Sequence, residues 1–98
     1  ALPQRALDAY LQAENWPAAQ TLAEQWTRSG SPQAHVLLGK LLAFEDLSRA
    51  RQEFAAANVE ATSDLVRALD QPDQALRLVL LGRAFLAQND LTLALRAF

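Results

Sequence analysis

The sequence predicts an all-α protein built from antiparallel helical hairpins. Apolar residues make up 51% of the 98 residues, and leucine and alanine, two strong helix formers, dominate that fraction. β-Branched residues are scarce and isoleucine is absent, whereas a sheet protein would be rich in them. Short polar breaks recur between segments whose apolar residues have helical spacing. Connections this short force successive helices to be antiparallel.

The first hairpin is predicted from two such breaks. Its first helix opens at residues 2–3 and ends at Glu14. Asn15 is an N-cap candidate for the second helix, and Pro17 lies in the first turn, where a missing N–H costs nothing. That helix ends before Gly30, which is expected to be its left-handed C-terminal cap.

The remaining helices follow the same punctuation. Five more are predicted, over residues 32–44, 47–57, 64–69, 73–88 and 91–98. Ser31 and Ser63 are expected to cap two of them. Acidic residues stand at other boundaries, where they cap free backbone N–H groups: Glu45, Asp46, Asp70, Asp73 and Asp90. The prediction is therefore a single domain over residues 1–98, with hairpins at about 3–29, 32–57 and 73–98 and a non-repeating insert at 58–72.

One pattern recurs in the second helix of each hairpin. It is Trp16-x-x-Ala19-x-x-x-Ala23-x-x-Trp26, Leu47-x-x-Ala50-x-x-x-Phe54-x-x-Ala57 and Leu91-x-x-Ala94-x-x-x-Phe98. The preceding helices carry Ala6-Leu7-x-x-Tyr10, Leu38-Gly39-x-x-Leu42 and Leu81-Gly82-x-x-Phe85. A small residue lets two crossing helices approach closely, and a large one beside it fills the remaining space. This pattern resembles the tetratricopeptide repeat, and residues 81–98 match it best.

The resemblance implies a tetratricopeptide-like α-solenoid of about three hairpins, with an extra short helix between the second and third. The repeats are degenerate. The family's tryptophan and closing proline are missing, and the turn of the second hairpin is one residue short. The interval from Ala19 to Ala50 is 31 residues and that from Ala50 to Ala94 is 44, which locates the insert. An irregular helical solenoid or bundle is the alternative.

By the same resemblance, a concave groove would bind the partner. Its residues would be Val36, Lys40, Ala43 and Phe44 in one hairpin, and Leu76, Val79, Arg83, Leu86 and Ala87 in the next. Lys40 and Arg83 each follow a glycine, so they are expected to project side by side and to suit an extended or helical peptide with aliphatic side chains and an acidic group. Alternatively, each extends its charge to water over a buried stem. Neither matches the asparagine of family members that bind chaperone C-termini, which disfavours that carboxylate clamp.

Six aromatic side chains at signature or helical spacing are expected to lie in the core: Tyr10, Trp16, Trp26, Phe54, Phe85 and Phe98. No catalytic or metal site is predicted. His35 is the only histidine and there is no cysteine, so a transition-metal site lacks the ligands it needs. No elbow or triad spacing surrounds the four serines, Ser29, Ser31, Ser48 and Ser63, which disfavours a nucleophile–histidine triad. Single, isolated glycines exclude a phosphate-binding loop. No cofactor is predicted either.

The expected partner is a protein or peptide. A net charge of −2 without a basic patch disfavours nucleic acid, and no apolar stretch reaches the ~18–20 residues that span a bilayer, so no membrane insertion is expected. The predicted function is a non-catalytic interaction scaffold, and by resemblance a component of a bacterial envelope or secretion assembly. The alternative is a spacer or self-association segment that forms a homodimer. The apolar last helix also predicts that either the parent chain continues past Phe98 or another subunit covers this helix. Absence of cysteine fits bacterial periplasm and cytoplasm equally.

Overall fold

A computed structural model describes residues 4–60 and 63–98, and within them the chain is entirely helical, with no strand. The helices are α1 (Gln4–Gln12), α2 (Trp16–Thr27), α3 (Pro32–Leu42), α4 (Leu47–Ala56), α5 (Asp64–Leu69), α6 (Gln74–Ala87) and α7 (Leu91–Ala97). The all-α prediction is confirmed, and the helices lie where the sequence predicts them. Two helices end earlier than predicted: α1 ends at Gln12, two residues before Glu14, and α3 ends at Leu42, two residues before Phe44. The predicted opening of the first helix at residues 2–3 lies outside the described residues.

Side-chain caps explain where the helices begin. Asn15, Asp46, Ser63 and Asp73 each accept a hydrogen bond from the backbone N–H three residues further on, at 3.4, 3.1, 3.4 and 2.9 Å. These bonds satisfy amides that have no partner inside the helix. Pro17 and Pro32 occupy the first turns of α2 and α3, as predicted. Ser31 has an extended backbone at the start of α3, but its hydroxyl makes no capping bond.

Left-handed residues end three of the helices. Glu14, Asn58 and Asn89 have φ values of 57°, 59° and 61°, and Gly30 follows α2 with a φ of 79°. The residue after Glu14, Asn58 or Asn89 donates its amide hydrogen to the carbonyl five residues before it. The acceptor carbonyls are those of Tyr10, Phe54 and Phe85, at 2.9, 2.9 and 2.8 Å. This six-to-one bond defines the Schellman motif, which reverses the chain within two residues. The left-handed conformation predicted for Gly30 is confirmed, although the C-cap position of α2 is held by Arg28.

The turn of the second hairpin is shorter. In it, the Asp46 amide donates to the carbonyl of Leu42, four residues back, at 2.7 Å. The corresponding bonds in the α1–α2 and α6–α7 turns, from Asn15 to Tyr10 and from Asp90 to Phe85, span five residues. The one-residue shortening predicted from the sequence is therefore present in the backbone.

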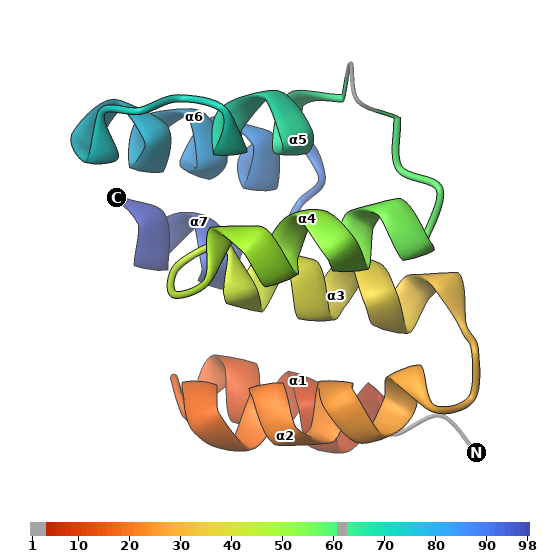
Figure 1. Cartoon of the computed structure of the whole chain (residues 1–98). Coiled ribbons are helices and arrows are strands. Elements are labelled where there is room, and N and C mark those ends of the chain that lie inside the picture. The colour runs from red at the N-terminus through yellow and green to blue at the C-terminus, as the bar shows by residue number, and fades with distance from the viewer. Residues whose placement is uncertain (1–3, 61–62) are drawn as a thin grey trace. The chain divides into compact units, whose positions relative to one another are not determined.

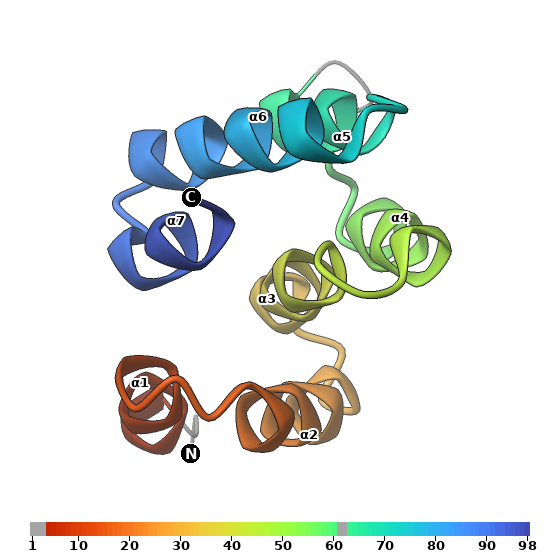
Figure 2. The same ribbon diagram turned by 90° about the vertical axis from the view of Figure 1, so that its left-hand side faces the viewer.

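Residues 1–59 form the first of two compact units. In it α1 packs on α2, α2 on α3 and α3 on α4, and the four helices lie roughly antiparallel (Figure 1) in a staggered row that is clearest when viewed along their axes (Figure 2). Alanines fill the helix contacts and larger side chains fill the space between them. The buried apolar residues are Leu7, Ala19, Ala23, Trp26, Ala34, Leu38, Leu41, Leu42, Ala43, Ala50 and Phe54.

Residues 60–98 form the second unit. The 14-residue α6 is its longest helix, and both α5 and α7 pack on it (Figure 1). The buried residues of this unit are Leu65, Ala68, Leu69, Leu81, Ala84, Phe85, Leu93, Ala94 and Ala97. The prediction of a single domain over residues 1–98 stays a prediction.

Two aromatic side chains do not lie where the sequence predicts them. Trp26, Phe54 and Phe85 are buried and Trp16 is half-buried, but Tyr10 and Phe98 are exposed. The prediction that all six would be core residues is therefore wrong for these two. Helical spacing places each ring on the correct face of its helix, but it does not provide a neighbouring helix to cover it.

Candidate functional site

The exposed face of α6 carries a stripe of large aliphatic residues around one cation. Asp73 caps the helix and sets its start, and Leu76, Val79, Arg83 and Leu86 then follow at intervals of three, four and three residues, which places them on one face. The three aliphatic side chains are 46%, 38% and 45% exposed, and Arg83 is exposed too. We call these four residues the α6 stripe. The opposite face of α6 is buried through Leu81, Ala84 and Phe85.

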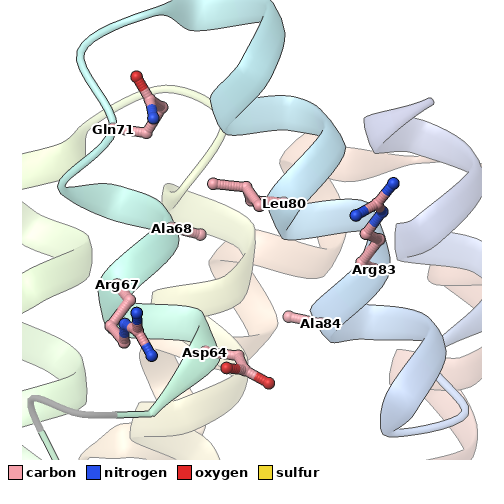
Figure 3. Close-up of a pocket in the computed structure, with 7 residues that line it drawn as sticks. All are labelled: Asp64, Arg67, Ala68, Gln71, Leu80, Arg83 and Ala84. Atoms are coloured by element: carbon pink, nitrogen blue, oxygen red, sulfur yellow. The ribbon is translucent and has the colours of Figure 1, made fainter.

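A hollow of about 460 Å³ lies between α5 and α6. The lining residues of each segment are spaced three or four positions apart, so each helix lines the hollow with one of its faces. Asp64, Arg67, Ala68 and Gln71 come from α5 and its C-terminal end, and Leu80, Arg83 and Ala84 come from α6 (Figure 3). Apolar side chains form its floor, while charged and amide groups stand around it. A hollow of this size and lining can hold a small ligand or part of a side chain.

The loop at one end of this hollow is fixed by hydrogen bonds. The Asp73 amide donates to the Gln71 side-chain oxygen at 3.2 Å. The Arg77 guanidinium donates to the Gln71 carbonyl at 2.9 Å. Arg77 is half-buried, so its guanidinium makes its contacts within the second unit. These bonds tie the end of α5 to the first turn of α6 and set the spacing of the two lining faces.

The two arginines that line the hollow are available for other contacts. Arg67 and Arg83 are exposed, and within residues 4–60 and 63–98 neither guanidinium has a hydrogen bond or an ion pair. A guanidinium offers five N–H donors in a planar arrangement that matches a carboxylate or phosphate. Against these two positive charges the lining has one negative charge, on Asp64. The hollow therefore favours an anionic group.

The predicted groove residues divide between the two units. Leu76, Val79, Arg83, Leu86 and Ala87 all lie exposed on α6 of the second unit. In the first unit, Val36, Lys40 and Phe44 are half-buried on α3 and just after it, and Ala43 is only 3% exposed. The expectation that Ala43 faces a partner is therefore wrong, because the core takes up its methyl group. The predicted side-by-side arrangement of Lys40 and Arg83 stays a prediction.

His35 has a carboxylate partner. Its Nδ1 lies 2.6 Å from the Glu53 carboxylate, and both side chains are about four-fifths buried between α3 and α4. The pair links the two helices of the second hairpin. In the part of the chain that the structure describes, no three histidine, aspartate or glutamate side chains come close enough together to hold a metal ion. In the same residues, no helix is long and apolar enough to cross a membrane.

Arg67 belongs to the site although no motif in the sequence marks it. The short helix around it lies in the segment predicted as a non-repeating insert, and its position across the hollow from Arg83 (Figure 3) depends on how α5 docks on α6. The signal that was available is the spacing of Asp64, Arg67 and Gln71 along α5 and the two residues that follow it. A search of protein-family models, of curated proteins and of solved structures gave no match to the chain.

Proposed function

We propose that the chain is a non-catalytic protein-interaction module that binds a helical segment of a partner on the α6 stripe. The observation that carries the proposal is the exposure of Leu76, Val79 and Leu86 on one face of a single helix. Scattered exposed apolar residues are ordinary, but several of them on one face of a helix favour an interaction surface. Arg83, within that row, adds a preference for acidic groups.

A helical partner fits this surface better than an extended one. An extended peptide that binds by strand addition needs a sheet edge, and α6 has none to offer because its amides and carbonyls bond within the helix. The intervals of three and four residues in the stripe match the seam along which two helices pack at a shallow angle. Ten residues separate Leu76 from Leu86, so the seam is about 15 Å long and accommodates about three turns of a partner helix.

Several observations support a tetratricopeptide-like repeat arrangement for this module. Equivalent turns follow Tyr10 and Phe85 with the same six-to-one hydrogen bond. Gly39 and Gly82 each lie under an aromatic ring of the next helix. Within each unit the helices pack on their neighbours in the sequence, as stacked hairpins do.

A photo-crosslinking experiment tests the proposed function. A benzoylphenylalanine at Val79 should form one discrete adduct in an extract of the source cells, and a second variant with Leu76 and Leu86 changed to serine should lose it. The matched control carries the same probe at Gln52, an exposed residue of α4. Equal adduct patterns from the two probe positions would rule out the α6 stripe as the contact.

A second candidate function, self-association, is favoured by α7. Leu91, Leu95 and Phe98 lie on one face of this helix and are 60%, 75% and 63% exposed. The position of Leu95 corresponds to Arg51 in α4 and Gln20 in α2, so this helix is more apolar than its repeat equivalents. A copy of the chain could cover that face. Sedimentation of the wild type and of Leu95→Arg decides this: a wild-type monomer throughout the micromolar range eliminates self-association as the function.

A further inference from the structure

Arg83 belongs to two features at once. It is the cation of the α6 stripe, and it also lines the hollow between α5 and α6. Arg67 lines the same hollow from α5 (Figure 3). A partner that covers the stripe therefore contacts Arg83 and borders a hollow whose opposite side carries Arg67 (Figure 3). Neither guanidinium has an intramolecular partner among the described residues. Each of these groups gains most from an ionised oxygen acid.

The lining of the hollow defines the shape of the group that fits it. Ala68, Leu80 and Ala84 provide a floor of small and aliphatic surface, and the hollow of about 460 Å³ has room for more than a bare ion. A short methylene chain can lie on such a floor while its charged end reaches the rim. Gln71, whose loop is fixed by hydrogen bonds to Asp73 and Arg77, limits the hollow at one end.

We propose that this hollow receives an acidic side chain, aspartate or glutamate, of the helix that docks on the α6 stripe. Its carboxylate would accept hydrogen bonds from Arg67 and Arg83. This inference rests on the proposed function and adds a specificity to it: the stripe selects aliphatic residues, and the hollow selects an acidic residue beside them. Because α5 lies in the segment outside the repeat pattern, the selectivity is a property of this chain rather than of its repeats.

Two synthetic peptides test it. Both are acetylated and amidated helix-forming peptides with leucines at intervals of three, four and three residues. One has glutamates at the positions flanking the leucines, and the other has glutamines there. By fluorescence anisotropy at low salt, we expect the glutamate peptide to bind the wild type about fivefold more tightly. The preference should shrink as salt is added and disappear in the double variant Arg67→Gln/Arg83→Gln.

The control variant makes the same change in net charge at two residues that do not line the hollow. Arg5 and Arg28 are exposed arginines of the first unit, and Arg5→Gln/Arg28→Gln should keep the preference. Equal binding of the two peptides to the wild type, or a preference that survives Arg67→Gln/Arg83→Gln, would overturn the carboxylate site and leave helix docking intact. If neither peptide binds, the docking of a helix on α6 is overturned as well. A third peptide has glutamines and a free C-terminal carboxylate, and we expect it to bind more weakly than the glutamate peptide. Equal affinity of these two peptides would mean that the hollow binds a chain terminus rather than an acidic side chain.

Discussion

The ring of Phe54 lies directly over Gly39, so a Cβ atom added to this glycine would be 2.6 Å from Cε1 of the ring. The same relationship recurs in the second unit, where a Cβ on Gly82 would be 2.5 Å from Cε1 of Phe98. What differs is the freedom of the ring. Phe54 is 1% exposed and is enclosed by the core, whereas Phe98 is 63% exposed. The two glycines are therefore geometrically equivalent and energetically different.

Gly39→Ala should destabilise the first unit by about 1–2 kcal/mol. Overpacking an enclosed ring costs about 1–3 kcal/mol, and alanine recovers up to about 1 kcal/mol in helix propensity. Gly82→Ala should be neutral or slightly stabilising, because the exposed Phe98 ring can turn away. Both tryptophans lie in the first unit, so urea unfolding followed by tryptophan fluorescence reports on Gly39→Ala, and circular dichroism reports on Gly82→Ala. Equal stability changes for the two variants would contradict this account.

Glu53→Ala should cost the first unit about 1 kcal/mol, because it removes the oxygen that His35 contacts at 2.6 Å in a half-buried setting. Glu24→Ala is the matched control. Its carboxylate lies 3.5 Å from Arg49 on a more exposed surface, where an ion pair contributes about 0–1 kcal/mol. Urea midpoints from tryptophan fluorescence compare the two variants. If Glu53→Ala costs no more than Glu24→Ala, the contact with His35 does not hold α3 and α4 together.

Asp46→Ala should destabilise the first unit by about 1 kcal/mol, because the carboxylate accepts the Arg49 amide hydrogen bond at the start of α4. Ser31 occupies the same position at the start of α3 but makes no capping bond, so Ser31→Ala should change stability by less than about 0.5 kcal/mol. Thermal unfolding of both variants at one protein concentration measures the difference. A larger loss from Ser31→Ala than from Asp46→Ala would be the opposite of what the cap geometry requires.

Leu81→Ala and Leu76→Ala distinguish the two faces of α6. Leu81 is fully buried, so its truncation should cost about 2–5 kcal/mol and lower the urea midpoint of the second unit. Leu76 is 46% exposed, and its truncation should change stability by less than about 0.5 kcal/mol while weakening binding of the leucine peptides. Circular dichroism follows unfolding. A large stability loss in Leu76→Ala would mean that the α6 stripe is structural rather than a binding surface.

Local chemistry made the helices predictable. Ser63 and Asp73 were sufficient to place the starts of α5 and α6, because a capping side chain acts within three residues of itself. The left-handed Gly30 and the short turn before Asp46 were predictable for the same reason. Each of these features depends on a few consecutive residues, and the sequence contains all of them.

Burial was less predictable because it depends on which helix lies opposite. Phe54 and Phe98 occupy equivalent positions in the repeat pattern, yet only Phe54 is enclosed. Ala43 was predicted to face a groove and instead lies in the core. Of the two arginines at the hollow, Arg83 follows from its repeat, whereas Arg67 depends on the packing of α5 on α6. Spacing along one helix does not contain that information.

The hydrogen bonds that close the turns after Glu14 and Asn89 connect residues only five positions apart. The helices that those turns join are also neighbours in the chain, so much of the packing in each unit brings together residues that are close in sequence. A chain of this kind closes only small loops as it folds, and proteins with such low contact order fold in microseconds to milliseconds. Each hairpin can consequently assemble as soon as its own residues are available, before the next pair of helices has formed.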